Sequence, residues 1–232
     1  MGAAVRRTVV SIEGRVVVAS RAATAADAPA VAGELARLRA CRHPGVVRVV
    51  AEVAGPRPGY ATAWVGAATL ATRCPEPGDL AARLADAAAT LADLHERGDA
   101  HGRLTPARMV LGGTGRIVLC GLGAVAPDDP ATVAADDVEA LGRTIHELTG
   151  TTAELEPIPS RHLRPGRAWS GATTRALQLL ADHATTEQPS ARPTMRHLAD
   201  ALALLASADE RTPPWRRELL GLGGRRRRDL AG

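Results

Sequence analysis

The sequence contains no lysine, no asparagine and no phenylalanine, so all 29 of its Lys+Arg positions are arginine. Without lysine the chain cannot form a lysine Schiff base, build a GxxxxGK[ST] phosphate loop or hold nucleotide phosphates with an ammonium group. Without asparagine it has no asparagine metal ligand. A genome rich in G and C accounts for much of this bias, but a codon bias does not replace a catalytic side chain.

Cysteine is also scarce. Cys41, Cys74 and Cys120 show no CxxC spacing, so we expect neither a zinc site nor a disulfide framework and favour a reducing compartment. The chain lacks an apolar run of about 18 residues, and residues 1–10 lack the features of a signal peptide. These absences predict a cytoplasmic protein that holds no metal.

Positive charge is concentrated at the C-terminal end of the chain. The formal net charge is +4, and the run Arg225–Arg228 alone carries four positive charges. Clustered arginines bind polyanions by releasing counterions, but no aromatic residues are interleaved with this run. We therefore expect a solvated tail and no nucleic-acid partner, and contact with an anionic membrane surface or nucleic acid through Arg225–Arg228 stays an alternative.

The hydrophobic content of 45% over 232 residues is sufficient for a sizeable core. Alternating β-branched residues predict strands early in the chain, and apolar residues at a spacing of three to four predict helices later, so we expect an α+β architecture. The expected strands fall in 8–20 (two strands around a turn at Glu13-Gly14), 46–50, 60–65, 109–111 and 116–120, and the expected helices in 27–41, 79–96, 136–149, 170–183 and 194–206.

A short sequence motif after the predicted 79–96 helix gives the first indication of function. His101, Leu104 and Pro106 match the order H-R-D-L-x-P in the catalytic loop of protein kinases, so this part of the chain resembles that family. In the family, an Asp of this loop positions the substrate hydroxyl and an Asn holds Mg²⁺. Here the Asp position is Arg103, the neighbouring Lys position is Thr105 and the Asn position is Arg108.

Further landmarks extend the resemblance over about residues 12 to 206. Glu34 stands where kinases carry the glutamate of their regulatory helix, nine positions before His43-Pro44-Gly45. Asp137 resembles the aspartate that fixes the catalytic-loop backbone, and Arg192 lies in a late Arg-Pro-Thr turn. The resemblance implies a two-lobed protein-kinase-like fold with a reduced β-rich N-lobe (1–66), a helical C-lobe (67–208) and an Arg-rich tail (209–232).

The departures from the family pattern concern the catalytic groups. The Mg²⁺-binding Asp of D-F-G is Gly121, no Gly-rich loop precedes the second strand, and the phosphate-binding lysine is absent. Arg21 occupies that region and is a candidate to pair with Glu34, although an arginine fork is not a conservative replacement for lysine. Arg103 cannot act as a base, because a guanidinium stays protonated at physiological pH.

The segment after Gly123 is also short. Only the 13 residues 124–136 separate Gly123 from Asp137, too few for an activation segment and its peptide platform. Arg192 must therefore find another partner than the glutamate that ends this segment in kinases. Asp128, Asp129 and Glu154 are the candidates, and an exposed Arg192 is the alternative.

The structural positions of the family are kept. The resemblance implies that His101, Leu122, Leu38 and a valine of the following strand stack as a spine through both lobes, with Asp137 at its base. Leu122 keeps apolar volume at the position of the D-F-G phenylalanine, next to Gly121, which has lost the metal ligand.

The resemblance therefore predicts a pseudokinase without catalytic residues, metal or required cofactor. We expect a regulatory or scaffolding module that binds a protein partner, for example an active kinase or a phosphopeptide-binding module. ATP binding without Mg²⁺ stays open. The alternative is a divergent serine/threonine kinase or other ATP-dependent transferase. Arg103 and Arg108 could also hold a phosphate or carboxylate, although solvated surface arginines are the simpler interpretation.

Overall fold

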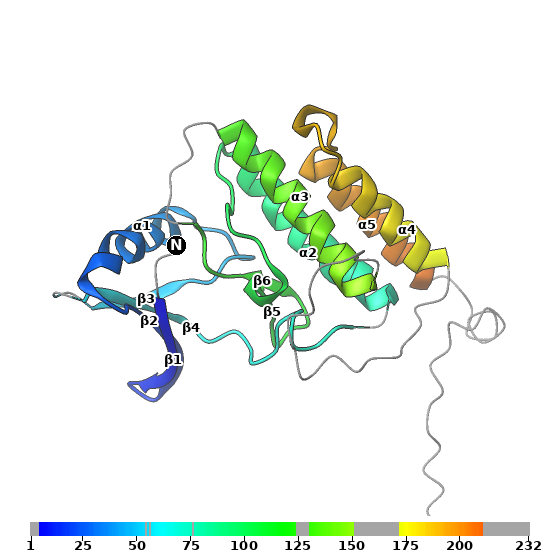
Figure 1. Cartoon of the computed structure of the whole chain (residues 1–232). Coiled ribbons are helices and arrows are strands. Elements are labelled where there is room, and N and C mark those ends of the chain that lie inside the picture. The colour runs from blue at the N-terminus through cyan, green and yellow to red at the C-terminus, as the bar shows by residue number, and fades with distance from the viewer. Residues whose placement is uncertain are drawn as a thin grey trace, which may run out of the picture.

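The computed structural model of the chain describes residues 5–53, 55, 57–75, 77–123, 130–150 and 172–210. Over these ranges the fold is mixed α+β, as predicted, with a sheet at one end and a group of long helices at the other (Figure 1). No helix in the described ranges combines the length and the apolar character needed to cross a membrane.

The sheet has four antiparallel strands in the order β1-β2-β4-β3. Its strands are β1 (Val5–Ile12), β2 (Arg15–Ala22), β3 (Val49–Val53) and β4 (Gly59–Ala63). Glu13 and Gly14 join the first two strands with φ values of 49° and 73°. Two consecutive left-handed residues are typical of a type I′ hairpin turn, so the predicted hairpin is confirmed.

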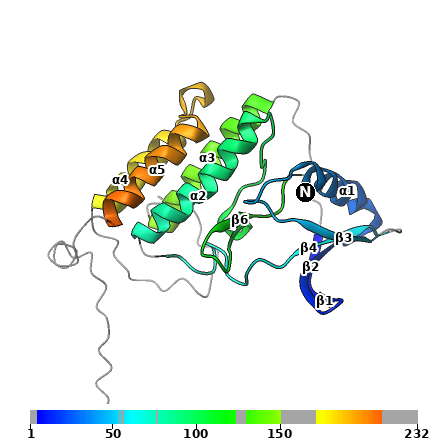
Figure 2. The ribbon, with the colours of Figure 1, turned by 180° about the vertical axis from the view of Figure 1, so that it is seen from behind.

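The strand predicted at 46–50 begins later than expected, at Val49. Val46 and Val47 instead pair with a second hairpin, β5 (Met109–Leu111) and β6 (Ile117–Leu119). The Val47 N–H donates to the Leu119 carbonyl at 3.0 Å, and the Leu119 N–H donates to the Gly45 carbonyl at 2.7 Å. These bonds join the segment that leads into the sheet to the small hairpin between the sheet and the long helices (Figures 1 and 2).

Helix α1 (Ala28–Ala40) lies against the sheet and contacts β2, β3 and β4. Pro29 stands in its first turn, and Cys41 follows its last residue, as predicted. Its buried face carries Val31, Leu38 and the charged Glu34. Because Glu34 is a buried carboxylate, it requires an oppositely charged or hydrogen-bonding partner.

The long helices pack side by side, α2 chiefly with α5 and α3 with α4 (Figures 1 and 2). Leu80, Leu84 and Leu91 of α2 are fully buried at the centre of this group. The bounds are α2 (Pro77–Glu96), α3 (Pro130–Thr149), α4 (Ala172–Ala184) and α5 (Met195–Glu210), with short 3-10 turns η1 (Ala25–Asp27), η2 (Pro106–Arg108) and η3 (Pro189–Ala191). Helix α3 begins six residues before the predicted start at 136, and α5 continues to Glu210, four residues beyond its predicted end at 206. Arg225–Arg228 lie outside the described residues.

We predict that Glu13→Asn stabilises the β1–β2 hairpin. Left-handed backbone is unfavourable for most L-residues, whereas Asn tolerates it and Asn-Gly is preferred in type I′ turns, so the free energy of unfolding should rise by about 0.5–1 kcal/mol. Urea denaturation of the full chain measures the change. Glu13→Ala removes the same side chain, but alanine does not favour left-handed backbone, so the free energy of unfolding should not rise. An equal free energy of unfolding in the two variants would contradict the turn assignment.

Candidate functional site

The candidate site is built on the loop between α2 and β5, which a buried carboxylate on α3 holds in place. Asp137 accepts hydrogen bonds from the backbone N–H groups of His101 at 2.6 Å and Gly102 at 2.8 Å. His95 Nε2 lies 3.1 Å from the same carboxylate. Asp137 is 1% exposed, and its oxygens are compensated by these donors. Asp137 therefore holds the loop backbone at residues 101 and 102.

The His101 ring links the loop to the segment after β6. Its Nδ1 accepts the Arg103 N–H at 3.3 Å, which leaves the ring proton on Nε2, and Nε2 donates to the Cys120 carbonyl at 3.1 Å. Burial lowers the pKa of His101 from its ordinary 6.5 to about 4, against the opposing effect of Asp137. His101 is therefore neutral at pH 7 and acts as a structural hydrogen-bonding group.

Arg108 occupies the place where the resemblance expects metal ligands. Its Nη1 donates to the Gly121 carbonyl at 2.6 Å. A Cβ atom on Gly121 would lie only 1.8 Å from this Nη1, so the guanidinium fills the space beside residue 121. Burial, followed by the charges of Arg103 and Arg7, lowers the pKa of Arg108, but guanidinium groups remain protonated in proteins. A fixed cation thus lies beside Gly121.

Glu34 pairs with Arg7, which the sequence analysis missed. Arg7 Nη2 lies 3.3 Å from Glu34 Oε1, and the Glu34 side chain is almost fully buried. The predicted Arg21–Glu34 pair is wrong, because Arg21 is exposed and Ser20 is the buried residue of β2 at this point. Arg7 faces Ser20 across the hairpin, so both side chains project to the face that carries Glu34.

Arg37 is a second contact that the sequence did not reveal. It lies one turn after Glu34 on α1, and its Nη1 donates to the Gly123 carbonyl at 2.7 Å. Its Nη2 bonds the Asp99 carboxylate and the Ala100 carbonyl. Arg37 therefore ties α1 both to the loop before His101 and to the segment after β6. The i, i+3 spacing from Glu34 was the only signal in the sequence.

The Arg192 side chain is only 6% exposed and is paired, so the alternative of an exposed Arg192 is wrong. It reaches Glu139 on α3 at 2.8 Å and donates to the carbonyls of Thr186 at 2.9 Å and Ala135 at 3.1 Å. Asp136 lies further away, at 3.8 Å. The three partners considered from the sequence, Asp128, Asp129 and Glu154, lie outside the described residues.

Of the other residues singled out from the sequence, some are exposed and some are buried. Arg103 and Thr105 are exposed, and the Arg103 stem lies against Gly123, where a Cβ atom would be 3.3 Å from Arg103 Cγ. Leu122 and Leu38 are buried and belong to the same hydrophobic core, and His101 is also fully buried. Their burial agrees with the predicted spine, and the stacking of its members stays a prediction.

The space between the sheet and the loop is small. A cavity of about 80 Å³ is lined by residues that include Arg7, Ser20, Glu34, Tyr60 and Gly121. Burial, and then the nearby negative charge of Glu34, raises the pKa of Tyr60. Pockets that enclose drug-sized ligands and cofactors usually measure about 300–1,000 Å³, so this cavity does not enclose a nucleotide in the described conformation.

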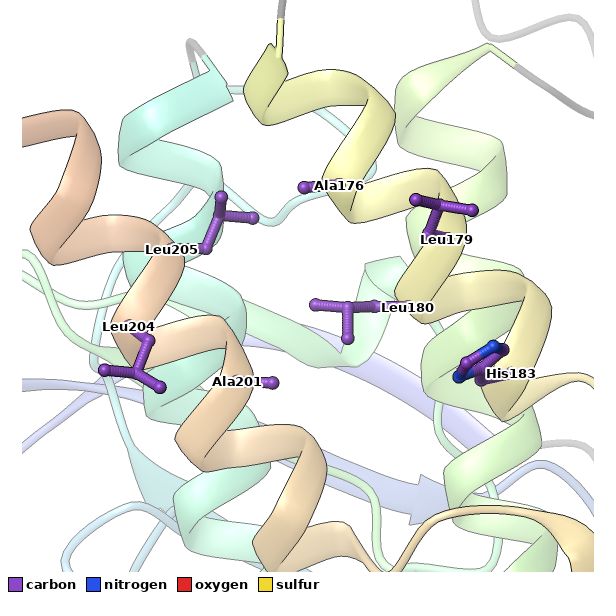
Figure 3. A pocket seen from close by; sticks show the side chains of 7 residues that line it. All are labelled: Ala176, Leu179, Leu180, His183, Ala201, Leu204 and Leu205. Atoms are coloured by element: carbon purple, nitrogen blue, oxygen red, sulfur yellow. The ribbon is translucent and has the colours of Figure 1, made fainter.

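A larger hollow lies elsewhere, on the surface between α4 and α5 (Figure 3). This groove of about 450 Å³ is almost entirely apolar, and Leu179 and Leu204 on its two walls are 56% and 68% exposed. His183 supplies its one polar side chain. The groove contains none of the predicted site residues.

Neither a metal-ligand cluster nor a known relative identifies the site. Among the residues that the structure describes, no three His, Cys, Asp or Glu side chains gather into a group that could hold a metal ion. No protein-family model and no curated protein sequence matches the chain.

We predict strong coupling between Arg108 and Gly121. Gly121→Ala should be costly in the wild-type background, because its Cβ would meet Arg108 Nη1, and much less costly together with Arg108→Ala. A coupling energy of about 1–3 kcal/mol is expected from urea denaturation of the four proteins in this double-mutant cycle.

A matched control separates the steric clash from backbone strain. Gly14 has the same φ of 73° as Gly121, with open space around its Cβ position. Gly14→Ala should therefore cost the same in both Arg108 backgrounds. A Gly121→Ala cost that does not depend on residue 108 would show that the guanidinium does not fill this space.

We also predict that the protein is less stable at acidic pH because of His101. Below its ordinary pKa of 6.5 the unfolded chain binds a proton at this residue, whereas the folded protein does not until about pH 4. The free energy of unfolding must therefore fall as the pH drops through this window, by about 2 kcal/mol between pH 7 and pH 5. His101→Gln should remove this part of the pH dependence in urea titrations.

His183→Gln is the control, because His183 is exposed. It should leave the difference between pH 7 and pH 5 unchanged. An identical pH dependence in His101→Gln and the wild type would contradict a neutral, buried His101.

Proposed function

We propose that the chain is a catalytically inactive, protein-kinase-like protein, a pseudokinase, that serves as a regulatory or scaffolding module for a protein partner. The observation that carries this proposal is the position of Arg108. Its guanidinium bonds the Gly121 carbonyl and fills the space beside residue 121, where the family resemblance expects an Asn and an Asp to hold Mg²⁺.

The contacts of the fold support the family part of the proposal. A sheet with one helix packed on it precedes a helical part, and the loop with His101 is held by a buried aspartate on a long helix. Arg7 and Glu34 form an ion pair between the sheet and α1. We infer a reduced two-lobed kinase fold, with a sheet lobe at 1–66 and a helical lobe from 67.

The electrostatics of the site argue against phosphoryl transfer. Kinases depend on metal ions that neutralise the transferring phosphoryl group and on a carboxylate that accepts or orients the substrate proton. Here Arg103 stands at the carboxylate position and Arg108 at a metal-ligand position, and neither can accept a proton or bind a cation. Without the groups that position the substrate and hold the metal, most of the rate enhancement of phosphoryl transfer is lost.

The described carboxylates near the site have other roles. Glu34 pairs with Arg7, Asp99 with Arg37, and Asp137 accepts the loop N–H groups. A divergent transferase would have to release one of them for a metal and break a structural contact. We therefore propose that the interactions that hold the fold have been kept for binding, with an active kinase or a phosphopeptide-binding module as the class of partner and the cytoplasm as its place.

Thermal unfolding of the full chain with millimolar ATP, in Mg²⁺ or in EDTA, tests the proposal. A ligand at about 100 times its Kd stabilises a protein by about 2.7 kcal/mol, which raises the Tm of a protein of this size by several degrees. We expect no Mg²⁺-dependent rise and no transfer of labelled phosphate to a generic protein substrate.

Each departure from this result has a definite meaning. A rise that requires Mg²⁺, together with labelled product, would overturn the proposal and favour the divergent transferase. A rise of equal size in EDTA would keep the inactive assignment and add nucleotide sensing. Arg108→Gln serves as the matched variant, because a nucleotide bound beside Gly121 must respond to the loss of this guanidinium.

A further inference from the structure

Positive charge gathers at the candidate site beyond what its carboxylates balance. The pKa of Arg108 is lowered by burial and then by the charges of Arg103 and Arg7, and Glu34 is the carboxylate that opposes them. Glu34 already forms an ion pair with Arg7. The uncompensated charge of the site therefore belongs to two guanidinium groups, Arg103 and Arg108.

These two arginines have guanidinium N–H donors that make no described hydrogen bond. A guanidinium has five N–H donors, and Arg108 spends one described bond on the Gly121 carbonyl. The Arg103 side chain has no hydrogen-bond or ion-pair partner among the described residues, and it is exposed. Both side chains lie against the 121–123 segment, Arg108 beside Gly121 and Arg103 beside Gly123, so both sets of donors belong to the same short stretch of chain.

The arrangement is also partly organised before any ligand binds. Arg108 is half-buried and anchored at 2.6 Å to the Gly121 carbonyl, and the Arg103 stem is in van der Waals contact with the Cβ position of Gly123. Side chains that are already fixed lose less conformational entropy on binding. Two adjacent guanidinium groups match the geometry and charge of a tetrahedral oxyanion.

The neighbouring cavity is not part of the arginine pair. It measures about 80 Å³, and its lining includes Arg7 and Gly121 but neither Arg103 nor Arg108. An anion held by the two arginines therefore stays outside this cavity, on the side where Arg103 is exposed. A phosphate monoester carries about −1.5 to −2 charges at pH 7, close to the two charges available.

We propose that Arg103 and Arg108 form a binding site for a tetrahedral oxyanion with the chemistry of a phosphate monoester. The group is held by charge-assisted hydrogen bonds from both guanidiniums. This inference rests on the proposed function in one respect, namely that the phosphate is bound and not transferred. The phosphate is either free in solution or attached to a side chain of a partner.

Isothermal titration calorimetry of the full chain tests the site, with inorganic phosphate and phosphoserine as separate probes and sodium chloride at matched ionic strength as the blank. We expect heat beyond the chloride blank, and a dissociation constant that weakens about tenfold or more in Arg103→Gln and in Arg108→Gln. Arg175→Gln, on the exposed face of α4, is the matched control and should leave binding unchanged.

Each outcome decides the proposal. No heat beyond the chloride blank, or equal weakening in Arg175→Gln, overturns it. Unchanged binding in Arg103→Gln overturns it as well, and this variant is informative even if Arg108→Gln fails to fold, because the Arg103 head group has no described structural bond. Binding of both probes supports a phosphate displayed on a partner, and binding of inorganic phosphate alone supports the free ion. Phosphotransfer in the ATP assay would overturn the proposed function and leave the titration result standing.

Discussion

The carboxylate of Asp137 is the interaction on which the rest of the site depends. Burying a carboxylate without partners is very unfavourable, so the two backbone N–H groups and the His95 ring that surround it are required for the fold. By fixing the backbone at residues 101 and 102, Asp137 orients the His101 ring toward the Cys120 carbonyl. That bond places the 121–123 segment where Arg108 and Arg37 reach it. One buried acceptor thereby connects α3, the loop, β6 and, through Arg37, α1.

The polar groups of the site hold its segments together. His101 is held neutral by burial, and its two ring nitrogens are both engaged by the backbone. Arg108 makes a structural hydrogen bond to the Gly121 carbonyl. Because an arginine remains charged where a histidine or lysine could shift its pKa, Arg108 also fixes a positive charge at the site.

The sequence predicted the elements well and the contacts less well. The Glu13-Gly14 turn, the start of α1 after Asp27 and the α2 periodicity carry strong local signals, and the structure has each of them. The start of β3 was misplaced, because Val46 and Val47 are as apolar as strand residues but bond to β6 instead. The Arg21 error is a shift of one residue, and in a strand such a shift moves the side chain to the opposite face. Arg7 could not be identified, since its role depends on hairpin register and not on any motif.

The contacts of α1 connect the sheet to the loop that carries His101. Arg7 reaches Glu34 from the outer strand of the sheet, where the inward position on the neighbouring strand is the short Ser20. One turn further along α1, Arg37 bonds Asp99 and the carbonyls of Ala100 and Gly123. The helix is thus attached on one side to the sheet and on the other to the loop, through residues at i and i+3. Two arginines of the chain itself provide these links, so protein groups alone connect α1 to the sheet and to the loop in this structure.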